Sequence, residues 1–162
     1  DVSVAASLPF RAALQSVADG CGSGKVELKW SVKGTSRMSA KVAEYAADGE
    51  QAPRAARIVD PIRATLVCED SQAMYTAWAA LRDGKCPGLR VTRLVNKVGR
   101  RVKPFNLHVN ALFSAPGVAP LTVEVQIMHA GLTGLFHLSH RCYELSRAGD
   151  AEEITGTLEG QR

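Results

Sequence analysis

Apolar and polar residues alternate along residues 121–127, which is the pattern of a strand with one buried face. The apolar positions are mostly β-branched, which favours a strand further; they are Leu121, Val123, Val125 and Ile127. The opposite face carries Glu124, a residue type that is uncommon inside strands. Two interpretations are open: Glu124 points into solvent, since antiparallel sheets commonly keep one wet face, or it is the acidic wall of a site.

The same patterns predict the other elements of the chain. Strands are expected at 26–32, 62–68, 89–95 and 106–113. The Gly/Pro turn at 114–120 then joins the strand at 106–113 to the strand at 121–127 in a hairpin. Helical spacing of apolar residues predicts helices at about 7–19, 34–47, 71–83 and 129–147, with Ser7 capping the first and Asp70 or Ser71 the third. The predicted fold class is therefore α+β, with a five-stranded mixed sheet flanked by helices.

Composition places the chain among ordinary globular proteins. At 162 residues, with 46% hydrophobic and 22% charged residues, it is expected to form one domain over residues 1–148, followed by an acidic, flexible tail at 149–162. The net charge of +4 suits an anionic ligand such as a nucleotide or RNA. No apolar run reaches the ~18 residues that a membrane span needs, so no membrane partner is expected.

Cysteine usage bears on the compartment. The four cysteines are widely separated and form no Cys-x-x-Cys pair, which fits a reducing, intracellular and most simply cytoplasmic location; they are Cys21, Cys68, Cys86 and Cys142. The chain begins at Asp1 without a methionine, so a targeting signal, an organellar one included, and membership in a longer chain are left open.

Two patterns that suggest ligand binding fail on spacing. The glycine-rich stretch 20–25 ends in Lys25, but no Ser or Thr follows and the next element is a strand, so we interpret it as a turn and not a phosphate loop. On the last predicted helix, Cys142 does not share a face with His137 and His140, which argues against a metal site there.

Basic residues offer better candidates. Lys33, Arg37 and Lys41 recur every four residues, either as a solvated basic face or as a cradle for phosphates. Arg63 is the only charge in an otherwise apolar run, where a cation is usually paired or bound to an anion. A second basic stretch either forms a solvated loop or hairpin or binds phosphates; it contains Arg93, Lys97, Arg100, Arg101 and Lys103.

Carboxylates complete a candidate site. Asp60 begins one strand and Glu124 lies in the middle of another, and together they could hold magnesium, which prefers one or two carboxylates plus substrate phosphate oxygens. The polar face of the sheet would place Gln126 beside Glu124, and Asn106, His108 and Asn110 on the neighbouring strand. Phosphoryl-type transfer needs mainly such positioning, metal and positive charge, so the site interpretation of Glu124 is favoured.

Several of these residues fall in an order that resembles a known family. The segments are Val32-Lys33-x3-Arg37-x3-Lys41-Val42, Asp60-x2-Arg63 with the strand after it, Val95-Asn96-Lys97, Val123-Glu124-Val125-Gln126-Ile127, and His140-x2-Tyr143-Glu144-x2-Arg147. Spread in this order over residues 26–147, they resemble a divergent RelA/SpoT-type domain, the alarmone synthetase family of nucleotidyltransferase-like fold.

The resemblance implies transfer of pyrophosphate from ATP to the 3′-hydroxyl of a guanine nucleotide, with Mg²⁺ as cofactor. It makes Asp60 a magnesium ligand and Glu124 a second acidic group for metal or base work. It assigns nucleotide or phosphate contacts to Lys33, Arg37, Lys41, Arg63, Lys97, Gln126 and His140. Phe105 stands in the stretch where the family carries a Tyr that stacks on the acceptor base.

The acceptor region also departs from the family pattern. The stretch Lys103-Pro104-Phe105-Asn106 has no counterparts of the family's Arg and Asp, and Leu135 is nearest to the place of a lysine in the last helix. The sequence is therefore compatible with two functions. One is a nucleotide pyrophosphotransferase; the other is a catalytically inactive module that binds nucleotide or RNA, or serves as an interaction domain in a larger assembly.

Overall fold

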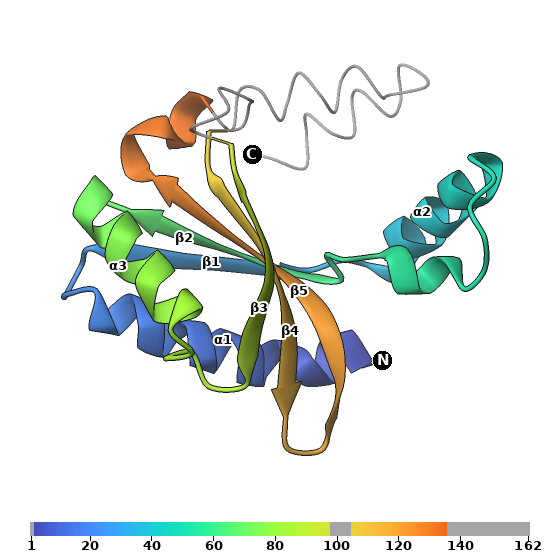
Figure 1. The fold of residues 1–162 in the computed structure, drawn as a ribbon, viewed down its shortest axis with the longest axis horizontal. Helices are drawn as coiled ribbons and strands as arrows, with labels where there is room; N and C mark the ends of the chain where they lie inside the picture. The colour runs from blue at the N-terminus through green and yellow to red at the C-terminus, as the bar shows by residue number, and fades with distance from the viewer. Residues whose placement is uncertain (1, 98–104, 136–162) are drawn as a thin grey trace.

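A computed structural model of the protein describes residues 2–97 and 105–135 (Figure 1). Its elements in chain order are α1 (Val2–Gly20), β1 (Val26–Val32), α2 (Thr35–Ala47), the 3-10 helix η1 (Arg54–Arg57), β2 (Ile62–Cys68), α3 (Ser71–Arg82), β3 (Leu89–Asn96), β4 (Leu107–Ala115), β5 (Val118–His129) and the 3-10 helix η2 (Ala130–Leu132). Residues 98–104 lie outside the described ranges, as do residue 136 and all that follow, which include most of the helix predicted at 129–147 and the tail at 149–162; residue 129 itself ends β5.

The five strands form one mixed sheet in the order β1-β2-β5-β4-β3. β2 and β5 run parallel, and the other three neighbouring pairs are antiparallel. This confirms the predicted α+β class with a five-stranded mixed sheet. The parallel pair has a consequence for the site, because it brings a strand from the first half of the chain beside the strand that carries Glu124.

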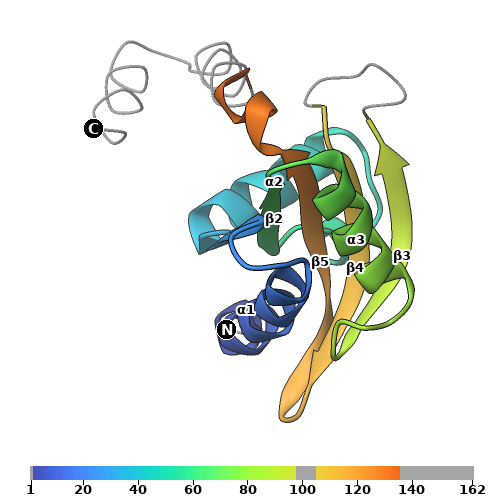
Figure 2. The same ribbon diagram turned by 90° about the vertical axis from the view of Figure 1, so that its left-hand side faces the viewer.

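One face of the sheet is covered by α1 and α3 (Figures 1 and 2). Alternate residues of the three central strands point to these helices and are fully buried, including Leu66, Val109 and Val125. Phe10 of α1 meets Phe113 of β4 edge to face, with ring centroids 5.3 Å apart. Because side chains alternate along a strand, the polar residues between these apolar ones belong to the other face.

The N-terminal helix begins earlier than the sequence pattern predicts. α1 starts at Val2, and Ser7 lies inside it, where its hydroxyl donates to the carbonyl of Val4 at 2.7 Å; the prediction that Ser7 caps the helix is wrong. The reason is that Ser3 and Ala6 are buried and continue the face that packs on the sheet. The cap of α3 is confirmed, since the Asp70 carboxylate accepts from the backbone N–H of Ala73 at 2.7 Å.

α2 differs from the two packed helices. It stands beyond the end of β1, away from the sheet (Figure 1), and no described residue of it is buried. Lys33 precedes α2 and does not belong to it, so the expected stack of Lys33, Arg37 and Lys41 on one helical face is wrong. Of these three residues, only Arg37 and Lys41 lie on α2. None of the helices in the described ranges has both the length and the apolar character to span a bilayer.

Candidate functional site

Glu124 lies at the centre of the polar face of the sheet. In the register of the sheet it stands opposite Arg63 of β2 on one side and Asn110 of β4 on the other. Its exposed fraction is 3%, so the interpretation in which it points into solvent is wrong. A carboxylate at this depth requires partners, because burying an unpaired charge is costly.

Asp60 is the second buried carboxylate, directly before β2, with an exposed fraction of 6%. Lys33 Nζ donates to its Oδ1 at 2.6 Å, and Arg63 Nη2 donates to its Oδ2 at 2.9 Å. Antiparallel pairing of β1 with β2 explains the first contact, because it carries Lys33 past the end of β1 to the chain before β2; the backbone N–H of Lys33 bonds to the Pro61 carbonyl at 2.9 Å.

Glu124 is contacted from three sides. Gln126 Nε2 donates to Glu124 Oε1 at 2.6 Å. Arg63 Nε lies 2.8 Å from the same oxygen, and His108 Nε2 lies 2.7 Å from Oε2. Neither the Arg63 nor the His108 nitrogen has its hydrogen-bonding geometry satisfied in these contacts, so we treat both as short electrostatic contacts. The result is a chain of charges that runs from Lys33 through Asp60 and Arg63 to Glu124.

These contacts set the protonation of Glu124. Burial on its own raises the pKa of this carboxyl, but the contact with His108, the charge of Arg63 and the hydrogen bond from Gln126 outweigh burial and lower the pKa to about 2. Glu124 is therefore ionised at neutral pH. A carboxylate in this state can pair with a cation or ligate a metal, but it has little tendency to take up a proton.

A layer of amide side chains supports the carboxylate. Asn106, which is fully buried, donates from Nδ2 to Oε1 of Gln126 at 2.9 Å, and Gln126 in turn donates to Glu124. Among the described residues, Asn106 Oδ1 and Asn110 Nδ2 have no hydrogen-bond partner although both atoms are buried. Leaving such an atom unsatisfied costs roughly 1–3 kcal/mol, so these two amides are notable on a face already rich in polar groups.

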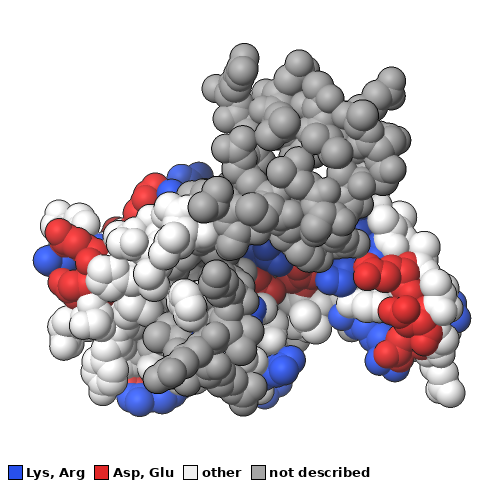
Figure 3. All heavy atoms as spheres, turned by 90° about the horizontal axis from the view of Figure 1, so that it is seen from above, with Lys and Arg blue, Asp and Glu red and all other residues white. Residues whose placement is uncertain are grey.

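The remaining predicted site residues are spread around this centre. Lys41 lies over the ring of Tyr45, with Nζ 6.0 Å from the ring centroid, and Arg37 is exposed on the same helix. At the end of the molecule that carries α2, Figure 3 shows Lys and Arg side chains next to acidic side chains. Lys97 follows β3, where its N–H bonds to the Asn106 carbonyl at 3.0 Å, and Phe105 is half-buried next to that carbonyl. The predicted contact through His140 lies outside the described residues.

His108 belongs to the site but was not among the candidate ligand-binding residues predicted from the sequence. The signal for it was present, because alternation along 106–113 puts it on the polar face. The pattern predicts the hairpin of β4 with β5 but not its register, in which His108 stands opposite Gln126, two residues along β5 from Glu124.

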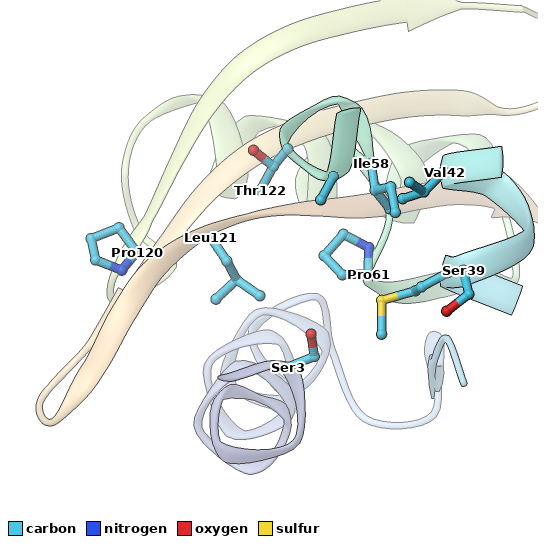
Figure 4. Close-up of a pocket in the computed structure, with 10 residues that line it drawn as sticks. Ser3, Ser39, Val42, Ile58, Pro61, Pro120, Leu121 and Thr122 are labelled. Carbon is cyan, nitrogen blue, oxygen red and sulfur yellow. The ribbon is translucent and has the colours of Figure 1, made fainter. Parts of the chain in front are cut away.

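Other features of the described residues do not compete for this role. A cavity of about 580 Å³ opens between the start of α1, α2 and the start of β5 (Figure 4), but its lining, which includes Ser3, Val42 and Leu121, contains no charged side chain. Burial raises the pKa of the Cys68 thiol to about 12 and that of Cys86 to about 11, so both remain protonated at neutral pH and are poor nucleophiles.

The donor set suits a magnesium ion that arrives with phosphate. Within the described ranges, no group of three or more His, Cys, Asp or Glu side chains is placed to hold a metal. Asp60 and Glu124, however, both contact the guanidinium of Arg63, so one oxygen of each carboxylate lies close to this group. Two carboxylates completed by substrate oxygens are a usual arrangement for magnesium, and the residues therefore fit it.

Comparison with known proteins identifies the fold. The sequence matches no protein-family model and no curated protein. Among solved structures, a GTP pyrophosphokinase family protein from Streptococcus pneumoniae has a TM-score of 0.74 at 14% identity, over 98% of this chain and 81% of that one. Small alarmone synthetase 1 from Bacillus subtilis, bound to its product pppGpp, gives 0.72 at 11% identity, over 92% and 79%. The same synthetase bound to AMPCPP gives 0.58 at 13% identity, over 93% and 83%.

The protein thus has the fold of the small alarmone synthetases. At identities of 11–14%, the resemblance drawn from the ordered sequence segments is confirmed at the level of the fold.

Proposed function

We propose that this protein is a RelA/SpoT-like nucleotide pyrophosphotransferase that uses ATP and magnesium to modify a guanine nucleotide. The observation that carries the proposal is the pair of buried carboxylates, Asp60 and Glu124, which share the guanidinium of Arg63 on one face of a sheet with the alarmone synthetase fold. The solved synthetases bound to pppGpp and AMPCPP support a nucleotide site on this fold.

Each group has a proposed role. Asp60 and Glu124 would hold magnesium, which when bound offsets negative charge on the transferred group. Lys33 and Arg63 are close enough to the carboxylates to meet phosphates bound beside the metal, and Arg37 and Lys41 on α2 would extend this positive surface along the donor nucleotide. The acceptor side would be formed by Phe105, Lys97, Gln126 and His140, with Phe105 stacking on the base.

Glu124 is better suited to metal ligation than to proton transfer. A general base works best when its pKa lies near the working pH, and the pKa of Glu124 is lowered to about 2. Of the two roles implied by the resemblance, the surroundings of this carboxylate therefore favour the metal role. The unsatisfied amide groups of Asn106 and Asn110 supply an acceptor and a donor that a bound nucleotide could use.

The test is a transfer assay with labelled ATP, magnesium and GDP or GTP. The wild-type protein is expected to form a 3′-pyrophosphorylated guanine nucleotide, and Asp60→Asn and Glu124→Gln are expected to abolish it. Asp83→Asn is the matched control, because Asp83 is an exposed carboxylate at the end of α3 that pairs with the neighbouring Arg82. Product that survives both site substitutions would refute the proposal, as would absence of product from the folded wild type.

The second candidate is a catalytically inactive module that binds nucleotide or RNA, or acts within a larger assembly. It is favoured by the departure at residues 103–106, where counterparts of the family's acceptor-binding Arg and Asp are missing. Thermal melting separates its versions, because a ligand at 100 times its Kd stabilises a protein by about 2.7 kcal/mol. Stabilisation by ATP, GTP or RNA without product would support a binding module; stabilisation by none of them would leave the interaction role.

A further inference from the structure

Arg63 occupies the position that the two carboxylates share. Its Nη2 lies 2.9 Å from Asp60 Oδ2, and its Nε lies 2.8 Å from Glu124 Oε1. The backbone explains this placement, because Arg63 lies three residues after Asp60 and stands opposite Glu124 in the parallel pairing of β2 with β5. A cation ligated by both carboxylates would have to stand close to the place where this guanidinium now lies.

Apart from His108, the charged groups of the cluster balance one another. Asp60 and Glu124 contribute two negative charges, and Lys33, 2.6 Å from Asp60, and Arg63 contribute two positive charges. A divalent cation placed between the carboxylates would meet the guanidinium at close range, and like charges a few ångströms apart repel strongly in a site shielded from water. Metal uptake therefore requires a positive side chain to move.

Of the two cations, Arg63 is the one built to move. Its side chain is 39% exposed, against 16% for Lys33, while both carboxylates are almost fully buried. The Nε–H of Arg63 is not aligned with the Glu124 oxygen, so movement of the guanidinium breaks one well-formed hydrogen bond, from Nη2 to Asp60, and not two. A guanidinium also binds phosphate as readily as carboxylate, which gives it a second partner near the site.

We propose that Arg63 is a resident counter-ion of the Asp60–Glu124 pair, which competes with divalent cations and yields its place only when nucleotide phosphates draw the guanidinium away. The competition follows from the contacts of Arg63 itself; the part played by phosphate rests on the proposed function. The device keeps the two buried carboxylates neutralised without metal and couples metal uptake to nucleotide binding.

The competition is tested by equilibrium dialysis of Mn²⁺, a spectroscopically countable substitute for Mg²⁺, against the protein without nucleotide. Arg63→Met is expected to bind Mn²⁺ at least about tenfold more tightly than wild type, because it removes one full charge at contact distance. Arg82→Met is the matched control, since Arg82 pairs with an exposed Asp83 on α3, and it is expected to equal wild type. The double variant Arg63→Met/Glu124→Gln is expected to lose the gain. Equal Mn²⁺ affinity of wild type and Arg63→Met overturns the proposal.

A second variant covers the case in which Arg63→Met does not fold. Arg63→Lys keeps the charge but has no fork with which to reach both carboxylates, so its Mn²⁺ affinity is expected to exceed that of wild type. An affinity of folded Arg63→Lys no higher than wild type, with Arg63→Met unfolded, also overturns the proposal.

Repeating the dialysis with AMPCPP separates this inference from the proposed function. AMPCPP is expected to raise the Mn²⁺ affinity of wild type much more than that of Arg63→Met, which has no guanidinium to displace. If Arg63→Met gains Mn²⁺ affinity but AMPCPP affects neither protein, the competition stands and the proposed nucleotide function fails. If AMPCPP binds but Arg63→Met shows no gain, the function stands and the resident counter-ion is refuted.

Discussion

Replacing Glu124 with glutamine removes a buried carboxylate whose pKa is lowered to about 2, against an ordinary value of 4.5. The unfolded chain lacks the surrounding groups, so its Glu124 titrates near the ordinary value. Because one pKa unit corresponds to about 1.4 kcal/mol, ionised Glu124 contributes about 3 kcal/mol to the free energy of unfolding. This contribution is complete above the unfolded pKa and is lost as the pH falls through the folded pKa.

The assay is urea unfolding of wild type and Glu124→Gln at about pH 5.5 and about pH 3. Between these two pH values the free energy of unfolding of the wild type is expected to fall by about 2 kcal/mol more than that of the variant. Carboxylates elsewhere titrate in both proteins, so their contribution cancels in this difference. Glu69→Gln is the control, because the Glu69 side chain is exposed and its carboxylate forms a surface ion pair with Lys25. If the difference between wild type and Glu124→Gln does not change with pH, the contacts assigned to Glu124 do not stabilise its charged form.

Three further substitutions, one with a matched control, test the packing of the fold and the Lys33 ion pair by chemical unfolding. Gly88→Ala is expected to lower the free energy of unfolding by at least about 2 kcal/mol, because φ is +73° there and a Cβ would collide with the Ser114 carbonyl oxygen. Gly84→Ala is the control, since Gly84 also has a positive φ but open space around it, and the expected loss is only about 1 kcal/mol. Leu66→Ala, at a fully buried position of β2, is expected to lower the free energy of unfolding by roughly 2–5 kcal/mol, and a smaller loss would show that the sheet can close the cavity. Lys33→Met is expected to lower the free energy of unfolding by about 1–3 kcal/mol, because it leaves Asp60 without one of its partners. An unchanged free energy of unfolding would mean that the ion pair of Lys33 with Asp60 is not formed in solution.

The strands and their faces could be predicted because one face of the sheet is buried under helices. Period-two alternation in 26–32 and 121–127 and the short apolar run at 62–68 carry that information directly, and the β1 and β2 ranges agree with the structure residue for residue. The same alternation placed Glu124 on the polar face. It could not say whether that face is wet, because exposure depends on what lies beside the strand and not on the strand itself.

The contacts within the site could not be predicted from local pattern. That Arg63 stands opposite Glu124 depends on the parallel pairing of β2 with β5, two strands that are not consecutive in the sequence. Lys33 illustrates the same limit, since its spacing from Arg37 suggests one helix face, whereas the end of β1 turns it toward Asp60. The start of α1 was missed because small residues such as Ser3 and Ala6 give little hydrophobic signal although they are buried.

The ligand's position on the protein tests the central claim most directly, and NMR titration of isotope-labelled protein with magnesium and AMPCPP measures it. If the polar face is the nucleotide site, the largest shifts are expected for Lys33, Arg63, His108, Glu124 and the side-chain amide of Gln126, with the Asp83 end of α3 unchanged. Shifts confined to the apolar cavity beside Ser3 and Val42, or no shifts at all, would contradict the account.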